Sequence, residues 1–199
     1  MTTPDPEPAP DRPAELRTDR LLLRPWRHED APRMLDLLSR VEVVQWLGDG
    51  PPVLMADLEE AHTRIDRYRE RSAEEPLGFW AVERPDGVVA GTVLLSVLPG
   101  AEHGEVEIGW HLHPDSWGAG YATEAARALL GYGFAHGLPE IIAVSHTHND
   151  ASQAVMRRLG MTDHGVTHRW YEEPSAFFSM TAEEWAEQRA EEARQAKSD

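Results

Sequence analysis

The chain of 199 residues is strongly acidic, with 35 aspartates and glutamates against 19 lysines and arginines and a formal net charge of −16. It contains no cysteine, which excludes disulfides, cysteine-ligated zinc and a thiol nucleophile. An acidic surface repels nucleic acid and attracts cationic partners such as amines, although the same charge is also explained by solubility alone. No run of about eighteen apolar residues indicates a membrane span, and the N-terminus lacks the basic start and apolar run of a signal peptide. We therefore expect a soluble cytoplasmic protein without nucleic-acid or membrane partners.

The length and the ends of the chain predict one domain with two peripheral segments. Residues 1–13 are rich in proline and are expected to be a disordered tail. Residues 14–181 are expected to form the domain. Residues 182–199 are expected to be a charged, peripheral C-terminal helix or tail, opened by the capping-box pattern at Thr181–Glu184.

The first half of the domain shows a short strand and two helices. The strand is Leu21–Arg24, and Asp30 can cap a helix with Pro32 in its first turn. The apolar face of this first helix is predicted to comprise Met34, Leu37, Leu38 and Val41. A second helix is indicated by the helical spacing of Leu54, Leu58, Ala61, Ile65 and Tyr68.

The second half alternates between strands and helices. A hairpin is predicted at 77–84 and 88–95, turning at 85–87. It is followed by a strand at 105–112, a helix ended by Gly137, a strand at 141–144, a helix from Asn149 or Asp150 to Leu159, and strands at 166–170 and 176–180. Because the helix pair precedes an antiparallel hairpin, the order predicts an α+β fold with one mixed sheet, not a doubly wound fold.

A glycine pair separates the strand at 105–112 from the helix that follows. Gly118 and Gly120 tolerate positive φ and let a ligand approach the backbone closely. The free N–H groups and the dipole at the start of the next helix favour phosphate oxygens. This segment therefore predicts an anion site.

Three blocks carry a family resemblance: Leu16–Pro25, Trp117–Ala125 and Asn149–Met161. In their order and spacing, over residues 15–181, the chain resembles GNAT-fold N-acetyltransferases. It is most similar to the RimJ/RimL-like branch that acetylates ribosomal-protein N-termini. The resemblance implies a mixed, mostly antiparallel, twisted sheet flanked by helices, with acetyl-CoA as cosubstrate and no metal.

The resemblance also assigns the coenzyme site. The pyrophosphate would lie on backbone N–H groups of Trp117, Gly118, Ala119, Gly120, Tyr121 and Ala122. This chain departs from the family pattern at two positions, because Asp115 and Ala119 stand where the family often has Gln or Arg and a basic residue. The site is therefore expected to hold an anion mainly through backbone groups.

The resemblance implies further contacts around the thioester. Gly109 falls where the family bulges its central strand, and the Leu112 amide is our candidate donor to the thioester carbonyl. A glycine there for packing alone is the alternative. Asn149 would bind the pantetheine amides, with a helix N-cap as its alternative role. Many relatives use a tyrosine to protonate the departing CoA thiolate, but this chain has Met156 at that position. Ser152 is then the remaining hydroxyl beside the sulfur, as an acid or as a hydrogen-bond donor to it.

Transfer to an amine also needs a base, and the strand at 105–112 offers several candidates. Glu105 and Glu107 share one face, and Glu107 could remove the proton, unless this is an ordinary acidic strand face. His111 and His113 share that parity and could serve with a near-neutral pKa. Two further histidines, His146 and His148, are expected to line the pantetheine gap and not to bind metal.

These features predict direct transfer of an acetyl group from acetyl-CoA to a primary amine, since no cysteine or Gly-x-Ser-x-Gly elbow suggests a covalent enzyme intermediate. A protein N-terminal amine suits the resemblance best, with a polyamine or an aminoglycoside as the alternative. Acceptor specificity is expected from residues 30–75 and 166–178. A noncatalytic acyl-CoA-binding regulatory module is a further alternative, and the resemblance is compatible with a homodimer.

Overall fold

The computed structural model describes residues 13–198. The tail expected at residues 1–13 therefore lies outside the described residues, except for Pro13. Within the described part, the predicted α+β class is confirmed, with helices on both faces of one mixed sheet. No helix in this part is long and apolar enough to cross a membrane.

The sheet has eight strands in the order β1-β2-β3-β4-β5-β6-β8-β7. Every neighbouring pair is antiparallel except β5 and β6. The strands are β1 (Leu16–Arg17), β2 (Leu22–Pro25), β3 (Gly78–Glu83), β4 (Val89–Val97), β5 (Val106–Leu112), β6 (Glu140–His146), β7 (Thr162–Thr167) and β8 (Ser175–Thr181).

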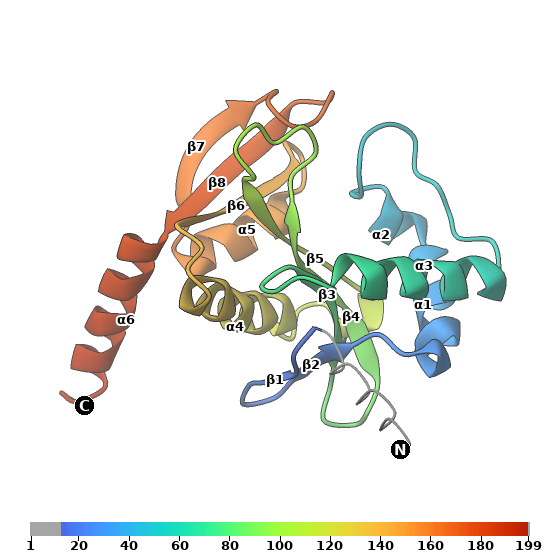
Figure 1. The fold of residues 1–199 in the computed structure, drawn as a ribbon, viewed down its shortest axis with the longest axis horizontal. Coiled ribbons are helices and arrows are strands. Elements are labelled where there is room, and N and C mark those ends of the chain that lie inside the picture. Colours follow the sequence, from blue (N-terminus) through green and yellow to red (C-terminus); the bar gives the residue numbers. More distant parts are fainter. Residues whose placement is uncertain (1–12, 199) are drawn as a thin grey trace, which may run out of the picture.

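The helices divide between the two faces of the sheet (Figure 1). They are α1 (Ala31–Leu38), α2 (Val41–Val44), α3 (Leu58–Arg71), α4 (Tyr121–Ala135), α5 (Asp150–Leu159) and α6 (Ala182–Gln195), with short 3-10 turns at His28–Asp30 and Pro114–Ser116. Apolar side chains of α4 and α5 pack on one face around Leu95 and Ile108. Those of α1 and α3 pack on the other around Phe79 and Ala81.

The parallel pair β5 and β6 separates along its length. Within residues 13–198, one register pair, Glu107 with Ile142, joins these strands. Each strand continues beyond that pair, β5 to Leu112 and β6 to His146, while remaining bonded to its antiparallel neighbour. The sheet is therefore open at its centre, in a wedge that begins at Glu107.

Three predicted details differ from the structure. Val41 lies in the separate helix α2 and is 55% exposed, so it does not extend the face of α1. Leu54 precedes α3, because Asp57 caps that helix by accepting a hydrogen bond from the Glu60 N–H at 3.0 Å. The penultimate strand runs over Thr162–Thr167 and not 166–170.

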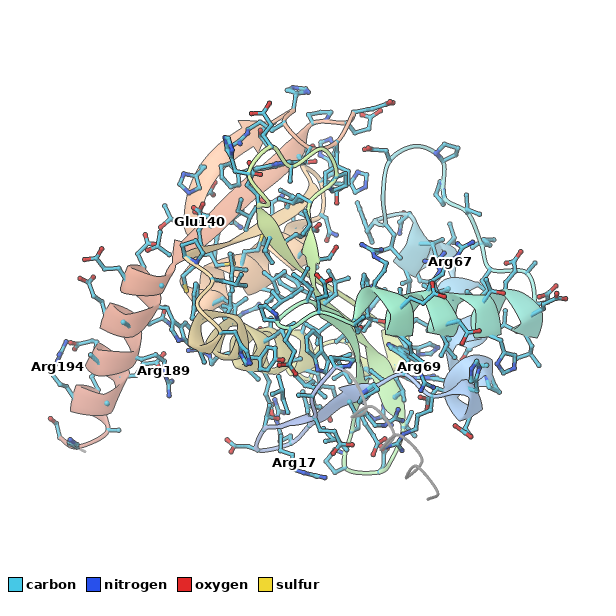
Figure 2. The ribbon with its side chains drawn as sticks, viewed as in Figure 1. Arg17, Arg67, Arg69, Glu140, Arg189 and Arg194 are labelled. Carbon is cyan, nitrogen blue, oxygen red and sulfur yellow. The ribbon has the colours of Figure 1, made fainter. Side chains whose placement is uncertain are left out.

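The C-terminal helix α6 begins at the predicted capping box, in which Thr181 and Glu184 bond reciprocally. None of its residues is buried. It nevertheless contacts α4, because the Trp185 ring lies 5.9 Å from that of Phe134 and Arg127 pairs with Glu192 at 2.7 Å. In Figure 2, Arg189 and Arg194 mark the outer part of this helix.

Candidate active site

A cavity of about 1150 Å³ occupies the wedge between β5 and β6. Its walls come from α2, α3, β4, β5, the glycine turn, β6, the first turns of α5 and Tyr171. Of the residues predicted for the site, Ala119, Glu105 and His113 do not line the cavity, and the following do: Glu107, His111, Leu112, Trp117, Gly118, Gly120, Tyr121, Ala122, Asn149 and Ser152. The sheet opening thus joins the glycine turn to the strand that carries Glu107.

The glycine turn has the geometry of an anion cradle. Gly118 and Gly120 have φ of +74° and +80°, a region that side chains disfavour, and Gly120 is the N-cap of α4. Glycine has no side chain that could cap the helix. The first-turn N–H groups of α4 therefore have no side-chain acceptor at the N-cap and are available to a ligand in the cavity. The turn can therefore hold phosphate oxygens by backbone donors.

A guanidinium that the sequence did not indicate also lies at this turn. Arg20 donates from Nη1 to the Ala119 carbonyl at 3.0 Å and pairs with Glu124 at 2.6 Å. Its Nη2 would lie 3.5 Å from a Cβ built on Gly120. A guanidinium paired with Glu124 thus lies beside the turn, and the sequence did not indicate it because Arg20 is far from the glycine motif along the chain.

Asp115, which stands where the family often has Gln or Arg, forms an ion pair with Arg33. Arg33 Nη2 bonds both carboxylate oxygens at 2.8 and 2.9 Å, and its Nε donates to the Val89 carbonyl at 2.7 Å. Partial burial opposes ionisation, but hydrogen bonds from Arg33, Ser116 and His113 hold the pKa of Asp115 well below its usual range. The carboxylate therefore anchors the start of the turn on α1.

Backbone directions place the Leu112 amide toward the wedge. The His113 N–H donates to the Ala90 carbonyl of β4 at 2.8 Å, so neighbouring Leu112 faces away from β4. Its carbonyl accepts from the Trp117 indole at 2.8 Å on that same side. Since a strand residue directs its N–H and C=O to one side, the Leu112 N–H also points into the wedge.

The bulge predicted at Gly109 is not present. The β4–β5 register runs without a shift from Leu112 to Val106, and the irregularity lies instead between β3 and β4, opposite Val82 and Glu83. A bulge in β5 is not needed to free the Leu112 amide, because β6 has already separated from β5 at this level.

Asn149 and Ser152 meet at the start of α5. Asn149 is the N-cap, and its Oδ1 accepts the Ser152 N–H at 3.1 Å. The cap leaves the Asn149 side-chain NH₂ group as a donor at the cavity wall. Met156, one turn further along α5, is fully buried in the core.

Among the carboxylates that line the cavity, Glu107 is the one that stands on the central strand β5. Its Oε2 accepts a hydrogen bond from the Tyr171 hydroxyl at 3.1 Å. Burial raises the pKa of Glu107 to about 7, although Tyr171 and Arg71 act in the opposite direction. Glu105 instead pairs with Arg169 at 2.9 Å and does not line the cavity.

His111, on β5, does not have the near-neutral pKa that was expected. His111 is buried, its Nε2 has no hydrogen-bond partner among the described residues, and burial followed by the charge of Arg64 lowers its pKa to about 4. His113 lies outside the cavity, with Nε2 3.1 Å from Asp36 and Nδ1 3.0 Å from Asp115. The raised pKa of Glu107 therefore suits a base near neutral pH, whereas the lowered pKa of His111 does not.

His146 lies beside the Trp46 ring, at 6.0 Å between centroids, and both line the cavity with His148. Within residues 13–198, no three histidine, aspartate or glutamate side chains are grouped so that they could hold a metal ion. Of the tryptophans, Trp80 is core, whereas Trp46 and Trp110 line the cavity.

The profile of one protein family, described as the acetyltransferase (GNAT) domain, matches residues 20–162. The chain belongs to the GNAT acetyltransferase family. It is 32% identical to an uncharacterized N-acetyltransferase, YoaA, of Bacillus subtilis (strain 168), over 78% of this chain and 86% of that protein. It is 30% identical to the FsC-acetyl coenzyme A-N(2)-transacetylase of Aspergillus fumigatus, over 85% of this chain and 77% of that protein.

Solved structures share the GNAT fold. Mycobacterium smegmatis RimJ in complex with CoA-disulfide aligns with a TM-score of 0.68 at 22% identity, over 82% of this chain and 83% of that one. The ribosomal-protein-S5-alanine acetyltransferase of Vibrio fischeri aligns with a TM-score of 0.69 at 18% identity, over 86% and 98%. The chain is thus an acetyl-CoA-dependent N-acetyltransferase of the GNAT family, and acetyl-CoA is the family's cosubstrate.

Proposed function

We propose that this GNAT enzyme acetylates the N-terminal amine of a protein or peptide, with Glu107 as the base. One observation carries the proposal: a carboxylate with a pKa of about 7 lies in the same cavity as the positive-φ glycine turn. A carboxylate that is ionised near pH 7 can accept the proton that an ammonium must lose before its nitrogen attacks. The alignment with the S5-alanine acetyltransferase fold is compatible with an N-terminal acceptor.

The coenzyme end of the cavity suits a long phosphorylated ligand. The backbone N–H groups from Trp117 to Ala122 would hold the pyrophosphate, with Arg20 nearby. The side-chain amide of Asn149 would bind the pantetheine arm, and the Leu112 N–H would donate to the thioester carbonyl. Bound acetyl-CoA would supply the acetyl group as an activated thioester.

The remaining groups divide the proton transfers. Glu107 accepts the amine proton, and the Tyr171 hydroxyl stabilises the carboxylate by donating to it. His111, with its pKa lowered to about 4, stays neutral at pH 7 and is a weaker base than Glu107. Ser152 Oγ, at the first turn of α5, is the hydroxyl available to hydrogen-bond the departing sulfur.

A small-molecule amine is the second candidate acceptor. It is favoured by a contact between two loops beside the cavity, where Asp49 accepts the Glu172 N–H at 3.1 Å and the Glu173 N–H at 3.4 Å. These bonds join the segment after α2 to the turn between β7 and β8, beside Tyr171. A loop contact that narrows the approach to Glu107 would favour a short substrate over a folded protein.

Mass spectrometry of a mixed peptide and amine library, incubated with acetyl-CoA, tests the proposal. We expect a mass gain of one acetyl group on peptide α-amines, strongly reduced with the E107Q enzyme. Acetylation confined to non-peptide amines would support the second candidate. Tight acetyl-CoA binding with no acetylated member would contradict both.

A further inference from the structure

One face of α3 brings two arginines to the acceptor end of the cavity. Arg64, Tyr68 and Arg71 recur at i, i+4 and i+7, so their side chains lie in one row along the helix, and all three line the cavity. The sheet residues beneath this row are Glu107, Gly109 and His111 of β5 and their partners Ser96, Leu94 and Thr92 of β4. Gly109 has no side chain, and the Leu94 side chain packs over it between Glu107 and His111.

Arg71 is held beside Glu107. Its Nη2 donates to Ser96 Oγ at 2.8 Å, and its guanidinium lies 4.6 Å from the centre of the Phe79 ring. Ser96 is the direct cross-strand partner of Glu107, so the two side chains stand on one face at neighbouring positions. The positive charge of Arg71 opposes the raised pKa of Glu107, as expected for two groups in one pocket.

Arg64 lies at the other end of the row, near His111. Its positive charge contributes to the lowered pKa of His111, and its guanidinium lies 6.0 Å from the centre of the Tyr68 ring. Neither Arg64 nor Arg71 forms a salt bridge with any residue in the described range 13–198. The two guanidiniums therefore keep hydrogen-bond donors available in a protein whose carboxylates outnumber its cations.

The geometry points to an acceptor that carries a carboxylate close to its primary amine, bound by Arg64 and Arg71 while the amine faces Glu107. This inference rests on the proposed function and names its substrate class. Guanidinium forks bind carboxylates through paired, charge-assisted hydrogen bonds. The same two cations repel a polyamine, which would place further positive charge against α3. The carboxylate could belong to an acidic first residue of a peptide or to a free amino acid.

Matched acceptors separate these sources. Asp-Ala-Ala-amide and Asn-Ala-Ala-amide differ only in the side-chain carboxylate, alanine and alaninamide differ only in the α-carboxylate, and spermidine represents polyamines. We expect the acid of at least one pair to have a kcat/KM about tenfold or more above its amide. Equal values within both pairs, or spermidine as the best substrate, would overturn the inference while leaving acetyl transfer intact.

Variants of α3 test the arginines themselves. R64Q and R71Q should reduce the preference for the acid about tenfold each, mainly through KM, and R71K should retain part of it. Arg67 and Arg69, labelled in Figure 2, are exposed on the same helix and do not line the cavity. R67Q and R69Q are therefore charge-matched controls that should keep the wild-type preference. An unchanged preference in R64Q and R71Q would contradict the assignment.

A binding measurement keeps the test independent of turnover. In the presence of CoA, calorimetry should show at least one acetylated acid, N-acetyl-Asp-Ala-Ala-amide or N-acetylalanine, binding more tightly than its amide counterpart, with the difference lost in R71Q. If this preference appears without acetyl transfer to any amine, the proposed function fails and the anion site stands. If transfer proceeds and the binding preference is absent, the anion site fails alone.

Discussion

The Tyr171 hydroxyl donates to Glu107 Oε2 at 3.1 Å and so links the turn between β7 and β8 to the central strand β5. Burial raises the pKa of Glu107, whereas this hydrogen bond lowers it by stabilising the carboxylate. The pKa of Tyr171 is also raised, first by burial and then by the nearby negative charge of Glu107. Tyr171 is therefore a positioning residue that sets the pH range in which Glu107 is ionised.

The Y171F variant tests this link. Without the donated hydrogen bond the carboxylate is less stable, so the rising limb of kcat/KM against pH should move to higher pH by about half a unit to one unit. The affinity for acetyl-CoA, measured by calorimetry, should stay unchanged. A pH profile that coincides with the wild-type profile would show that Tyr171 does not act on the titrating group.

Stability should depend on pH through Glu107. Its pKa is raised from 4.5 to about 7 in the folded protein, so the folded state holds a proton that the unfolded chain releases above pH 4.5. Between about pH 4.5 and 7 this group therefore destabilises the fold increasingly as pH rises. E107Q removes this effect. The free energy of unfolding of E107Q minus that of wild type should therefore be larger at pH 8 than at pH 4.5, by about 1–3 kcal/mol. Denaturant unfolding at both pH values measures this; an equal difference at the two pH values would refute it.

Gly120 offers a test of the coenzyme site with a matched control. Both Gly120 and Gly137 have positive φ, +80° and +85°, but Gly137 follows α4 and does not line the cavity. Alanine costs about 1–2 kcal/mol of stability at either position, because of the left-handed backbone. Only G120A should also weaken CoA binding, by about tenfold or more, since its methyl group and altered turn disturb the N–H cradle. Equal CoA affinity in the two variants would remove the glycine turn from the coenzyme site.

The Arg33–Asp115 pair should support the turn by charge neutralisation. In R33M the Asp115 carboxylate, close in sequence to the glycine turn, loses the guanidinium that bonds both of its oxygens, so CoA affinity should fall, and more at low salt. In the double variant R33M/D115N the uncompensated charge is gone, and most of the affinity should return. Calorimetry of both variants at two salt concentrations measures the coupling; a double variant as weak as R33M would indicate a purely structural role for Arg33.

The sequence was sufficient for the parts of the fold that local patterns determine. The hairpin at 77–95, the capping box of α6 and the α5 cap at Asn149 are confirmed, since each depends on residues only a few positions apart. Where the outcome depended on tertiary packing, the prediction failed. The irregularity expected at Gly109 lies instead between β3 and β4, and β7 begins four residues before its predicted start at Val166.

The site shows the same division. The glycine turn could be predicted from its sequence motif, and Glu107 from its position in the alternating pattern of a strand. The structure places both in one cavity. Arg20 and Tyr171 were missed, because they reach the site from elements 99 and 64 positions away from their partners Ala119 and Glu107. No spacing rule reports such contacts. The prediction of a near-neutral pKa for His111 was wrong for a related reason, because the burial that lowers this pKa arises only in the packed structure.

The pH dependence of kcat/KM for wild type and E107Q, measured with a peptide whose α-amine is free, is the sharpest test of Glu107 as the base. For the wild type we predict a limb that rises through about pH 7, as Glu107 loses its proton. For E107Q we predict a loss of about 10² to 10⁴ in rate, disappearance of that limb and an unchanged CoA affinity. An E107Q enzyme that keeps the wild-type rate and the same rising limb would show that another group accepts the amine proton.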